Sequence, residues 1–272
     1  MFYDIVGCNF MRFTILGSGS SGGVPRIGGV WGACDPLEPK NRRRRSSFLI
    51  EKGSGDAVTR VLVDTSPDLR EQLLMAGVRV LDGVVYTHSH ADHTHGIDDL
   101  RAVYFHSKKR IPVFYEVETG AVLLEKFRYC FEQPEDANYV PILDGCLIEA
   151  FKGFSIEGAG GTVDLMPFSQ LHGNGRSLGF RIGDLVYATD VHAFPDDSLA
   201  VMEGAEVLVL DALRYSTHPC HLSVEEALVL IERLAPKRAI LTHLHIDLDY
   251  QTLKAELPSG VEPAYDGLVI EC

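Results

Sequence analysis

Short apolar segments recur along the chain from Arg12 onward, separated by positions rich in Gly, Pro, Asn and Asp. Such runs of roughly four to eight residues between turn formers are typical of strands. In the first half they predict strands over Arg12–Leu16, Ser47–Glu51, Arg60–Val63, Gly83–Tyr86 and Ile111–Tyr115. In the second half they predict strands over Leu147–Phe151, Phe154–Glu157, Thr162–Pro167, Ser177–Ile182, Leu185–Thr189, Val207–Leu210 and Ala239–Leu241.

Helical periodicity occurs between these strands. Leu69, Leu73 and Leu74 would share one face of a helix that Pro67 opens. Ser223 and Glu226 have the spacing of a capping box. The predicted helices cover residues 67–76, 98–105, 118–131 and 223–234. Strand-rich halves with interspersed helices indicate an α/β class, with two sheets packed face to face and covered by helices.

Length and composition predict one large domain. The chain has 272 residues, 46% of them hydrophobic, and no stretch resembles a linker. We expect a single domain over residues 11–272, because the first clean strand opens at Met11. Residues 1–10 are interpreted as an N-terminal extension, or as the product of an upstream start.

The charge and the cysteines narrow the class of protein. A formal net charge of −13 disfavours a partner as anionic as a large nucleic acid. A small phosphate ester stays compatible, because bound metals reverse the local field. The six cysteines contain no CxxC pair, which indicates reduced thiols and a cytoplasmic protein. No apolar run reaches the roughly 18 residues of a membrane span, and we predict no membrane partner.

Polar residues stand at, or just past, the C-terminal ends of five predicted strands. These residues are Asp64, His88, Asp190, Asp211 and His243. Ligands gather at such strand ends in sheets that are covered by helices. We therefore expect the five side chains to border one site.

The densest cluster of potential metal ligands is the run from His88 to His93, which also contains His90 and Asp92. A loop leaving a strand can turn three imidazoles and a carboxylate inward, and this donor set suits zinc, manganese or iron. The alternative is a polar surface loop. A metal site is favoured because the cluster directly follows a buried strand.

The chain resembles the metallo-β-lactamase superfamily. Residues 87–93 match its HxHxDH motif, and the other motifs follow in order at Asp64, His172, Asp190 and His243. The resemblance implies a four-layer αββα sandwich with a dinuclear site at one edge. It also implies two divalent metal ions, zinc or manganese.

The resemblance assigns the ligands one by one. It gives His88, His90 and His172 to one metal, Asp92, His93 and His243 to the second, and Asp190 to a bridge between them. Each metal keeps an open position for water. Asp64 would orient a ligand histidine, or cap the helix that follows. His245 is an alternative ligand to His243.

Four segments resemble the phosphoribosyl 1,2-cyclic phosphate phosphodiesterase group. They are residues 17–25, 42–47, 221–227 and 264–268. The chain departs from that group where relatives carry several cysteines for a structural zinc, because here only Cys34 is present. A single thiol cannot form a tetrahedral thiolate site, so we predict no structural zinc.

These features predict a phosphodiesterase for a small cyclic or nucleotide-like phosphate ester, acting by metal-hydroxide attack. His221 would protonate the leaving oxygen, unless it is a surface histidine and His218 serves instead. Asp92, Asp190 and His221 are the predicted catalytic residues, and Arg45, Arg176, Ser177 and His218 the predicted substrate contacts. Two alternatives stay open: hydrolysis of another ester, lactone or thioester, and a non-enzymatic metal-dependent binding protein. The sequence also leaves a homodimer open.

Overall fold

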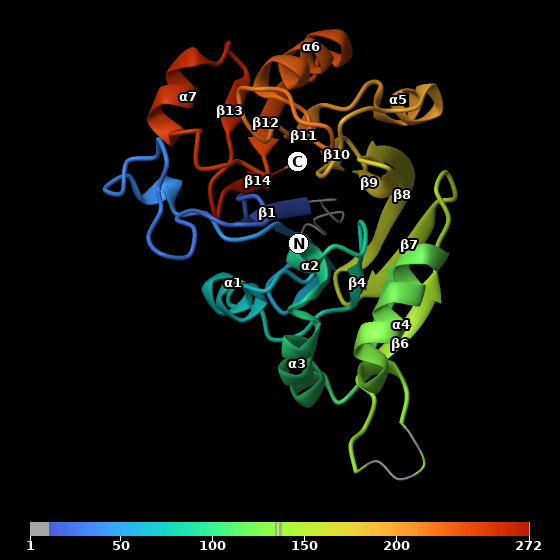
Figure 1. Cartoon of the computed structure of the whole chain (residues 1–272). Helices are drawn as coiled ribbons and strands as arrows, with labels where there is room; N and C mark the ends of the chain where they lie inside the picture. Colours follow the sequence, from blue (N-terminus) through green and yellow to red (C-terminus); the bar gives the residue numbers. More distant parts are fainter. Residues whose placement is uncertain (1–10, 134, 136–137, 272) are drawn as a thin grey trace, which may run out of the picture.

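Two sheets stack face to face in this chain, and each carries helices on its outer side (Figure 1). The structure is a computed structural model that describes residues 11–133, 135 and 138–271. The predicted extension over residues 1–10 lies outside the described residues. In the described part, no helix has the length and apolar character needed to cross a membrane.

The first sheet has seven strands in the described residues. Their order is β14 (Val269–Glu271), β1 (Met11–Gly17), β2 (Ser47–Ser54), β3 (Ala57–Val63), β4 (Gly83–Val85), β5 (Ile111–Tyr115) and β6 (Leu143–Leu147). Strands β14 to β3 pair antiparallel, whereas β3 to β6 pair parallel. The parallel strands therefore present their C-terminal ends at one edge.

The second sheet, like the first, has seven strands in the described residues and combines parallel with antiparallel pairing. Its strands are β13 (Val261–Pro263), β12 (Arg238–Thr242), β11 (Val207–Asp211), β10 (Leu185–Ala188), β9 (Gly175–Ile182), β8 (Gly161–His172) and β7 (Phe154–Gly158). Strands β10 to β13 are parallel, and β7 to β10 are antiparallel. Both sheets are thus mixed, with a parallel portion on one side.

Strand alternation separates three apolar layers. In β2, Phe48 and Ile50 point into the core between the sheets, while Leu49 points to the outer helices, as the two-residue period of a strand requires. Phe48 stacks on Tyr187 of the opposite sheet with ring centroids 4.5 Å apart. The predicted αββα sandwich is confirmed.

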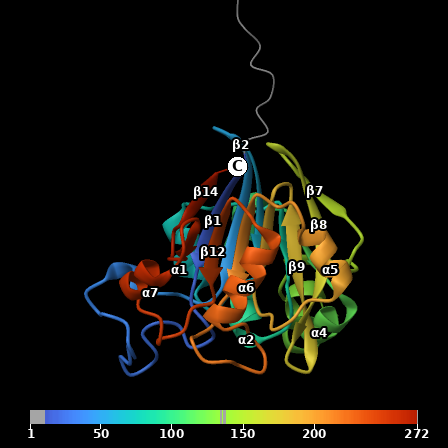
Figure 2. The same cartoon turned by 90° about the horizontal axis from the view of Figure 1, so that it is seen from above.

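Helices cover both outer faces. The first sheet is covered by α1 (Leu69–Ala76), α3 (Leu100–Ser107) and α4 (Val117–Phe131), and the second by α5 (Asp196–Met202), α6 (Val224–Leu234) and α7 (Tyr250–Glu256). The short helices η1 (Pro39–Asn41), α2 (Ala91–Thr94) and η2 (Ile97–Asp99) lie in connections. Figure 2, seen from above, shows α5, α6 and α7 in front of their sheet, with the loop of residues 20–40 beside α7.

The capping box of α6 is confirmed. Ser223 Oγ accepts the Glu226 N–H at 3.3 Å, and Glu226 Oε2 accepts the Ser223 N–H at 2.8 Å. The expected apolar face of α1 is only partly right, because Leu69 and Leu73 are buried but Leu74 is 62% exposed. Gln72 occupies the buried position instead, since its side chain bonds Ser66 and the Arg45 carbonyl.

The predicted strand over residues 147–151 is wrong. Strand β6 lies over residues 143–147, where it pairs in register with β5. Leu143 is buried, whereas Leu147 is 68% exposed. The chain then turns, and Phe151 adopts a positive φ of 65°, which a strand does not allow. The helices α2, α5 and α7 and the strands β13 and β14 were not predicted.

Candidate metal centre

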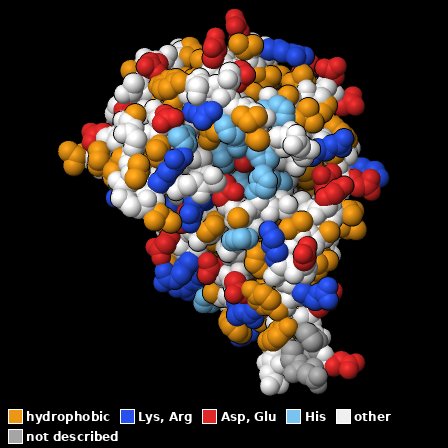
Figure 3. All heavy atoms as spheres, viewed as in Figure 1, with side chains coloured by type: hydrophobic (Ala, Val, Ile, Leu, Met, Phe, Trp, Pro, Cys, Tyr) orange, Lys and Arg blue, Asp and Glu red, His pale blue; other side chains and the backbone are white. Residues whose placement is uncertain are grey.

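The predicted strand-end residues meet at one edge of the sandwich. Asp64 and His88 follow the parallel strands β3 and β4, and Asp190, Asp211 and His243 end or follow β10, β11 and β12. Figure 3 shows histidine side chains gathered in a hollow on this face, with carboxylates among them. The five side chains therefore lie close together, as the strand-end pattern predicted.

Three of these residues hold an unusual backbone conformation. Asp64, Asp190 and His243 have φ values of 62°, 56° and 61°, in the left-handed region. Non-glycine residues there cost on the order of 1–3 kcal/mol each and cluster at functional sites. The surrounding strands must therefore hold these three residues in place.

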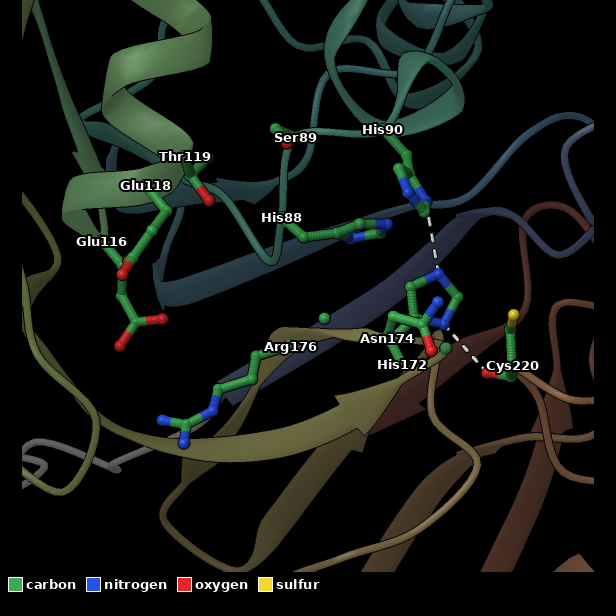
Figure 4. A pocket seen from close by; sticks show the side chains of 12 residues that line it. His88, Ser89, His90, Glu116, Glu118, Thr119, His172, Asn174, Arg176 and Cys220 are labelled. Carbon is green, nitrogen blue, oxygen red and sulfur yellow. Dashed lines mark hydrogen bonds between the residues drawn. The ribbon is translucent and has the colours of Figure 1, made fainter.

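His88, His90 and His172 form the first group of candidate ligands, with nitrogen atoms within 4.8 Å of one another. The Nδ1 of His172 donates to the Cys220 carbonyl at 2.9 Å. That bond directs its Nε2 toward His90 Nδ1, at 3.2 Å (Figure 4). His88 Nδ1 lies 3.0 Å from Thr87 Oγ1. A partner on the other ring nitrogen is how proteins fix the orientation of a ligand histidine.

Asp92, His93, Asp190 and His243 form the second group, also within 4.8 Å. His93 Nε2 lies 3.0 Å from Asp190 Oδ2 and 3.4 Å from Asp92 Oδ2. His243 Nδ1 lies 3.3 Å from the same oxygen of Asp190, and 3.0 Å from Ser46 Oγ. Asp190 Oδ1 is 4.0 Å from His88 Nε2 and 3.8 Å from His172 Nε2. Asp190 therefore stands between the two groups, where a bridging carboxylate would stand.

Two buried nitrogens indicate that the residues fit metal ions. His88 Nε2 and His93 Nε2 are buried and have no hydrogen-bond partner in the described part of the chain. Buried polar atoms are almost always satisfied, and a cation would satisfy both. Imidazole nitrogens with carboxylate oxygens suit zinc or manganese.

Electrostatics favour metal-binding protonation states at His88 and Asp190 but not at His93. Burial would lower the pKa of His93, but Asp190, Asp92 and Asp64 outweigh it and raise this pKa well above its usual value. Burial and the neighbouring His93 hold the pKa of His88 well below its usual value, so its ring is neutral. Burial alone would raise the pKa of Asp190, but His243 and His93 outweigh it and hold this pKa well below its usual value. A neutral imidazole and an ionised carboxylate are the states that coordinate metal ions.

Asp64 has the orienting position that the resemblance implied. It is fully buried, and its Oδ2 accepts from His93 Nδ1 at 2.7 Å. It also accepts from the Thr87 N–H at 2.8 Å and from Thr87 Oγ1 at 2.7 Å. The alternative role as a helix cap is wrong, because Asp68 occupies the N-cap position of α1.

His221 lies at the site together with a partner that was not predicted for it. Its Nδ1 donates to Asp211 Oδ2 at 2.7 Å, and its Nε2 lies 4.0 Å from Asp190 Oδ1. Burial lowers the pKa of His221, but Asp211 outweighs it and raises the pKa to about 9. The ring stacks on His243 with centroids 4.7 Å apart. A charged imidazole thus faces the two groups of candidate ligands.

His218 is the weaker candidate for that role. Its Nδ1 accepts from the Cys220 N–H at 3.2 Å, within the turn that leads to His221. The centroids of the two rings are 5.2 Å apart. His245 is bonded to Arg26 and lies 2.9 Å from Asp247, and it belongs to neither ligand group. The geometry therefore favours His243 over His245 as the candidate ligand.

A cavity of about 840 Å³ opens beside the histidines. It is lined by His88, Ser89, His90, Glu116, Glu118, Thr119, His172, Gly173, Asn174, Gly175, Arg176 and Cys220. Of the predicted substrate contacts, only Arg176 is in this lining. Its side chain extends along the cavity away from His172 (Figure 4).

Ser177 and Arg45 do not reach this cavity. Ser177 is buried, and its hydroxyl donates to the Asp190 carbonyl at 2.8 Å, so it supports the backbone at the site. Arg45 lines a separate pocket and forms an ion pair with Asp68 at 2.6 Å. We therefore withdraw both as contacts to a substrate in the histidine cavity.

The glycine-rich loop packs closely against the backbone of residues 43–46. A Cβ at Gly17 would lie 1.9 Å from the Arg45 carbonyl oxygen, and one at Gly19 would lie 2.9 Å from Arg43 Cβ. The absence of side chains lets this loop approach the segment that carries Ser46, the partner of His243. Close backbone packing, rather than phosphate binding, accounts for these glycines.

Comparisons with known proteins agree with this geometry. The family model of the β-lactamase superfamily domain matches residues 59–244. A crystal structure described as a new diphosphatase from the PhnP family is 33% identical with a TM-score of 0.85, and 97% of each chain is covered. Zinc-bound PqqB from Methylobacterium extorquens shares the fold, at 19% identity and a TM-score of 0.70, over 95% of this chain and 99% of that one.

A curated relative gives a further match. An octanoyltransferase from Porphyromonas gingivalis is 33% identical over 261 residues, which are 95% of this chain and 51% of that protein. This chain therefore spans about half the length of that relative. The strand order, the placement of the histidines and the family match agree: the chain belongs to the β-lactamase superfamily, with the fold and candidate metal site of a hydrolase.

Proposed function

We propose that this protein is a dinuclear metal-dependent phosphodiesterase that hydrolyses a small cyclic or nucleotide-like phosphate ester. The observation that carries the proposal is the pair of ligand groups that share Asp190 at the wall of the cavity. Likeness over nearly the whole chain to a PhnP-family diphosphatase supports phosphorus rather than carbon as the centre of attack.

The ligand groups suit two divalent ions, zinc or manganese. His88, His90 and His172 would hold one ion, Asp92, His93 and His243 the other, and Asp190 would lie between them. Such a pair of ions would activate water and stabilise charge on the oxygens of a phosphoryl group during its transfer. Asp64 keeps the His93 ring in place by accepting from Nδ1, which leaves Nε2 free for the metal.

His221 would supply the proton that the leaving oxygen needs. In the reaction, water adds to phosphorus, the bond from phosphorus to the leaving oxygen breaks, and that oxygen takes a proton. Asp211 holds Nδ1 of His221, so that Nε2 is the nitrogen that faces the site. Arg176 is the lining residue that could contact the rest of the substrate.

The direct test is turnover of bis-p-nitrophenyl phosphate by chelator-treated protein, with and without added zinc or manganese. We expect activity only with metal. His90→Ala should lower kcat/KM by more than about a hundredfold, beyond the loss caused by removing a residue that only supports a ligand. His106→Ala, a control at an exposed histidine of α3, should keep full activity. Failure on every phosphodiester would reject the proposal.

A second candidate is hydrolysis of an acyl ester or thioester, because a relative is named an octanoyltransferase. The cavity opposes it, because His, Glu, Thr, Asn and Arg side chains dominate its lining, and no Leu, Ile, Val, Met or Phe is among the lining residues to pack on a long acyl chain. Turnover of p-nitrophenyl octanoate faster than of the phosphodiester would favour this candidate. A non-enzymatic metal-dependent binder would turn over neither compound.

A further inference from the structure

The cavity end that lies away from the candidate metal ligands is lined by charged and polar side chains that have no role in the proposed reaction. Figure 4 shows Glu116 and Glu118 on the α4 side of this end and the Arg176 guanidinium opposite them, far from His90. All three residues line the cavity. A substrate with its phosphorus at the metal groups would extend its other ester group toward this end.

Only one oxygen of the Glu116 carboxylate has a hydrogen-bond partner among the described residues. Glu116 precedes the first turn of α4 and is half-buried, and its side chain does not cap its own helix. Its Oε1 accepts the Ala150 N–H at 3.3 Å. No other hydrogen bond or ion pair reaches this carboxylate from the described residues. Burial raises the pKa of Glu116, and Glu118 acts in the same direction, while Arg176 opposes them.

Two further groups in this part of the cavity lack partners. Thr119 is only 8% exposed, and its side chain points into the cavity (Figure 4). Its hydroxyl makes no hydrogen bond to any residue that the structure describes. Arg176 is exposed, and within those residues its guanidinium has neither an ion pair nor a hydrogen bond. No described residue occupies the hydrogen-bonding capacity of these two side chains, so both are free to contact a polar group of a ligand in the cavity.

The balance of charge decides what kind of group fits. Two carboxylates face one guanidinium here, so a second phosphate or a carboxylate on the substrate would meet like charge as it loses water. A hydroxyl or an ammonium would instead donate to the free oxygen of Glu116, and a hydrogen bond to an ionised group is among the stronger ones. The Thr119 hydroxyl can accept or donate beside it.

We propose that the Glu116 end of the cavity selects substrates whose second ester group carries a hydrogen-bond donor, a hydroxyl or an ammonium, and disfavours a second anionic group. Glu116 is the specificity-determining residue, and Arg176 and Thr119 complete the subsite. This inference rests on the proposed phosphodiesterase activity.

The test uses four p-nitrophenyl phosphodiesters that share one leaving group. Their second ester group is butyl, 4-hydroxybutyl, 4-aminobutyl or 3-carboxypropyl. For the metal-loaded protein we expect kcat/KM to be at least about tenfold higher for the hydroxyl and amino compounds than for the butyl compound. A hydrogen bond to a charged group is strong enough to produce a factor of this size. The carboxylate compound should be no better than butyl. A flat series, or a preference for the carboxylate, would overturn the inference.

Variants separate recognition from general effects. Glu116→Gln keeps the acceptor for Ala150 and removes the charge, and it should lower the amino-to-carboxylate ratio of kcat/KM by about tenfold or more. Glu125→Gln, at an exposed glutamate of the same helix, should keep the wild-type ratio. If Glu116→Gln does not fold, the wild-type series still decides. Hydrolysis of bis-p-nitrophenyl phosphate with a flat series rejects the subsite alone, whereas no phosphodiester turnover rejects the proposed function.

Discussion

Replacing Asp211 by Asn gives a selective test of how His221 works. Asp211 is fully buried, and its Oδ2 accepts both His221 Nδ1 at 2.7 Å and the Val191 N–H at 2.9 Å. Its Oδ1 has no partner in the described residues. An Asn amide oxygen can occupy the Oδ2 position and keep both bonds, with its NH₂ group at the unpaired position. The substitution therefore removes charge and leaves the contacts.

The magnitude follows from what that charge contributes. A hydrogen bond to a charged group stabilises by roughly 1.5–3 kcal/mol and a neutral one by roughly 0.5–1.5 kcal/mol. The difference of about 1–1.5 kcal/mol corresponds to a factor of about 5 to 13. Asp211 raises the pKa of His221 to about 9, so Asp211→Asn should lower this pKa by about one unit. The fraction of His221 that carries the proton to be donated then changes little at pH 7 but falls about fivefold to tenfold between pH 9 and pH 10.

The assay compares leaving groups. A p-nitrophenolate departs as an anion and needs little help from an acid, whereas an alkoxide must be protonated as it leaves. Measured between pH 9 and pH 10, Asp211→Asn should lower kcat about fivefold to tenfold for an alkyl phosphodiester and by less than about threefold for bis-p-nitrophenyl phosphate, whereas near pH 7 both losses should be small. His221→Ala should show the same pattern, with a loss of about 10² to 10⁴ on the alkyl ester. Equal losses on both substrates would refute the assignment of His221 as the acid.

Three further predictions concern a residue that orients a candidate ligand and two residues that stabilise the fold. Asp64→Asn should weaken metal affinity by about 10- to 100-fold in a titration calorimeter, because the His93 ring loses its charged partner. Arg43 is 2% exposed and donates to the carbonyls of Leu248 (2.7 Å) and His245 (3.2 Å), so Arg43→Met should lower the free energy of unfolding in urea by about 3 kcal/mol, and Arg43→Lys by less. Burial raises the pKa of Asp249, but hydrogen bonds from Thr252, Asn41 and Asp35 outweigh it and lower the pKa to about 2. Its stabilisation is therefore present above the unfolded pKa of about 3.9 and lost as pH falls through about 2. Asp249→Ala should cost about 1–2 kcal/mol at pH 7, a difference that shrinks in thermal melts between pH 4 and pH 2.

The ligand groups were open to prediction from sequence for a physical reason. A polar residue directly after an apolar strand is carried to the edge of the sheet whatever the rest of the fold does. Asp64 and His243 follow strands directly, and Asp190 and His88 follow them by two and three residues; the structure brings all four together. The capping box of α6 was likewise visible, because its contacts span only three residues.

The roles that sequence could not assign depend on contacts between distant segments. Asp211 was visible at a strand end, but its bond to His221 depends on the path of the loop between them. Arg45 and Ser177 have the chemistry of phosphate contacts, yet Asp68 pairs with the first and the Asp190 carbonyl with the second. Glu116 gave no signal, because its importance depends on the cavity that residues 172–176 and 220 complete.

The backbone at the site links strand termination to ligand placement. Asp64 and His243 adopt positive φ directly after β3 and β12, and Asp190 does so two residues after β10; a residue in that region cannot continue a strand. The step that ends each strand thus also places a side chain at the edge, where Asp64 meets His93, Asp190 meets both ligand groups and His243 meets Ser46. Aspartate tolerates this region comparatively well, and histidine is also found there more often than most residues. The parallel strands that precede these residues therefore set the positions of the ligand side chains as well as the edge of each sheet.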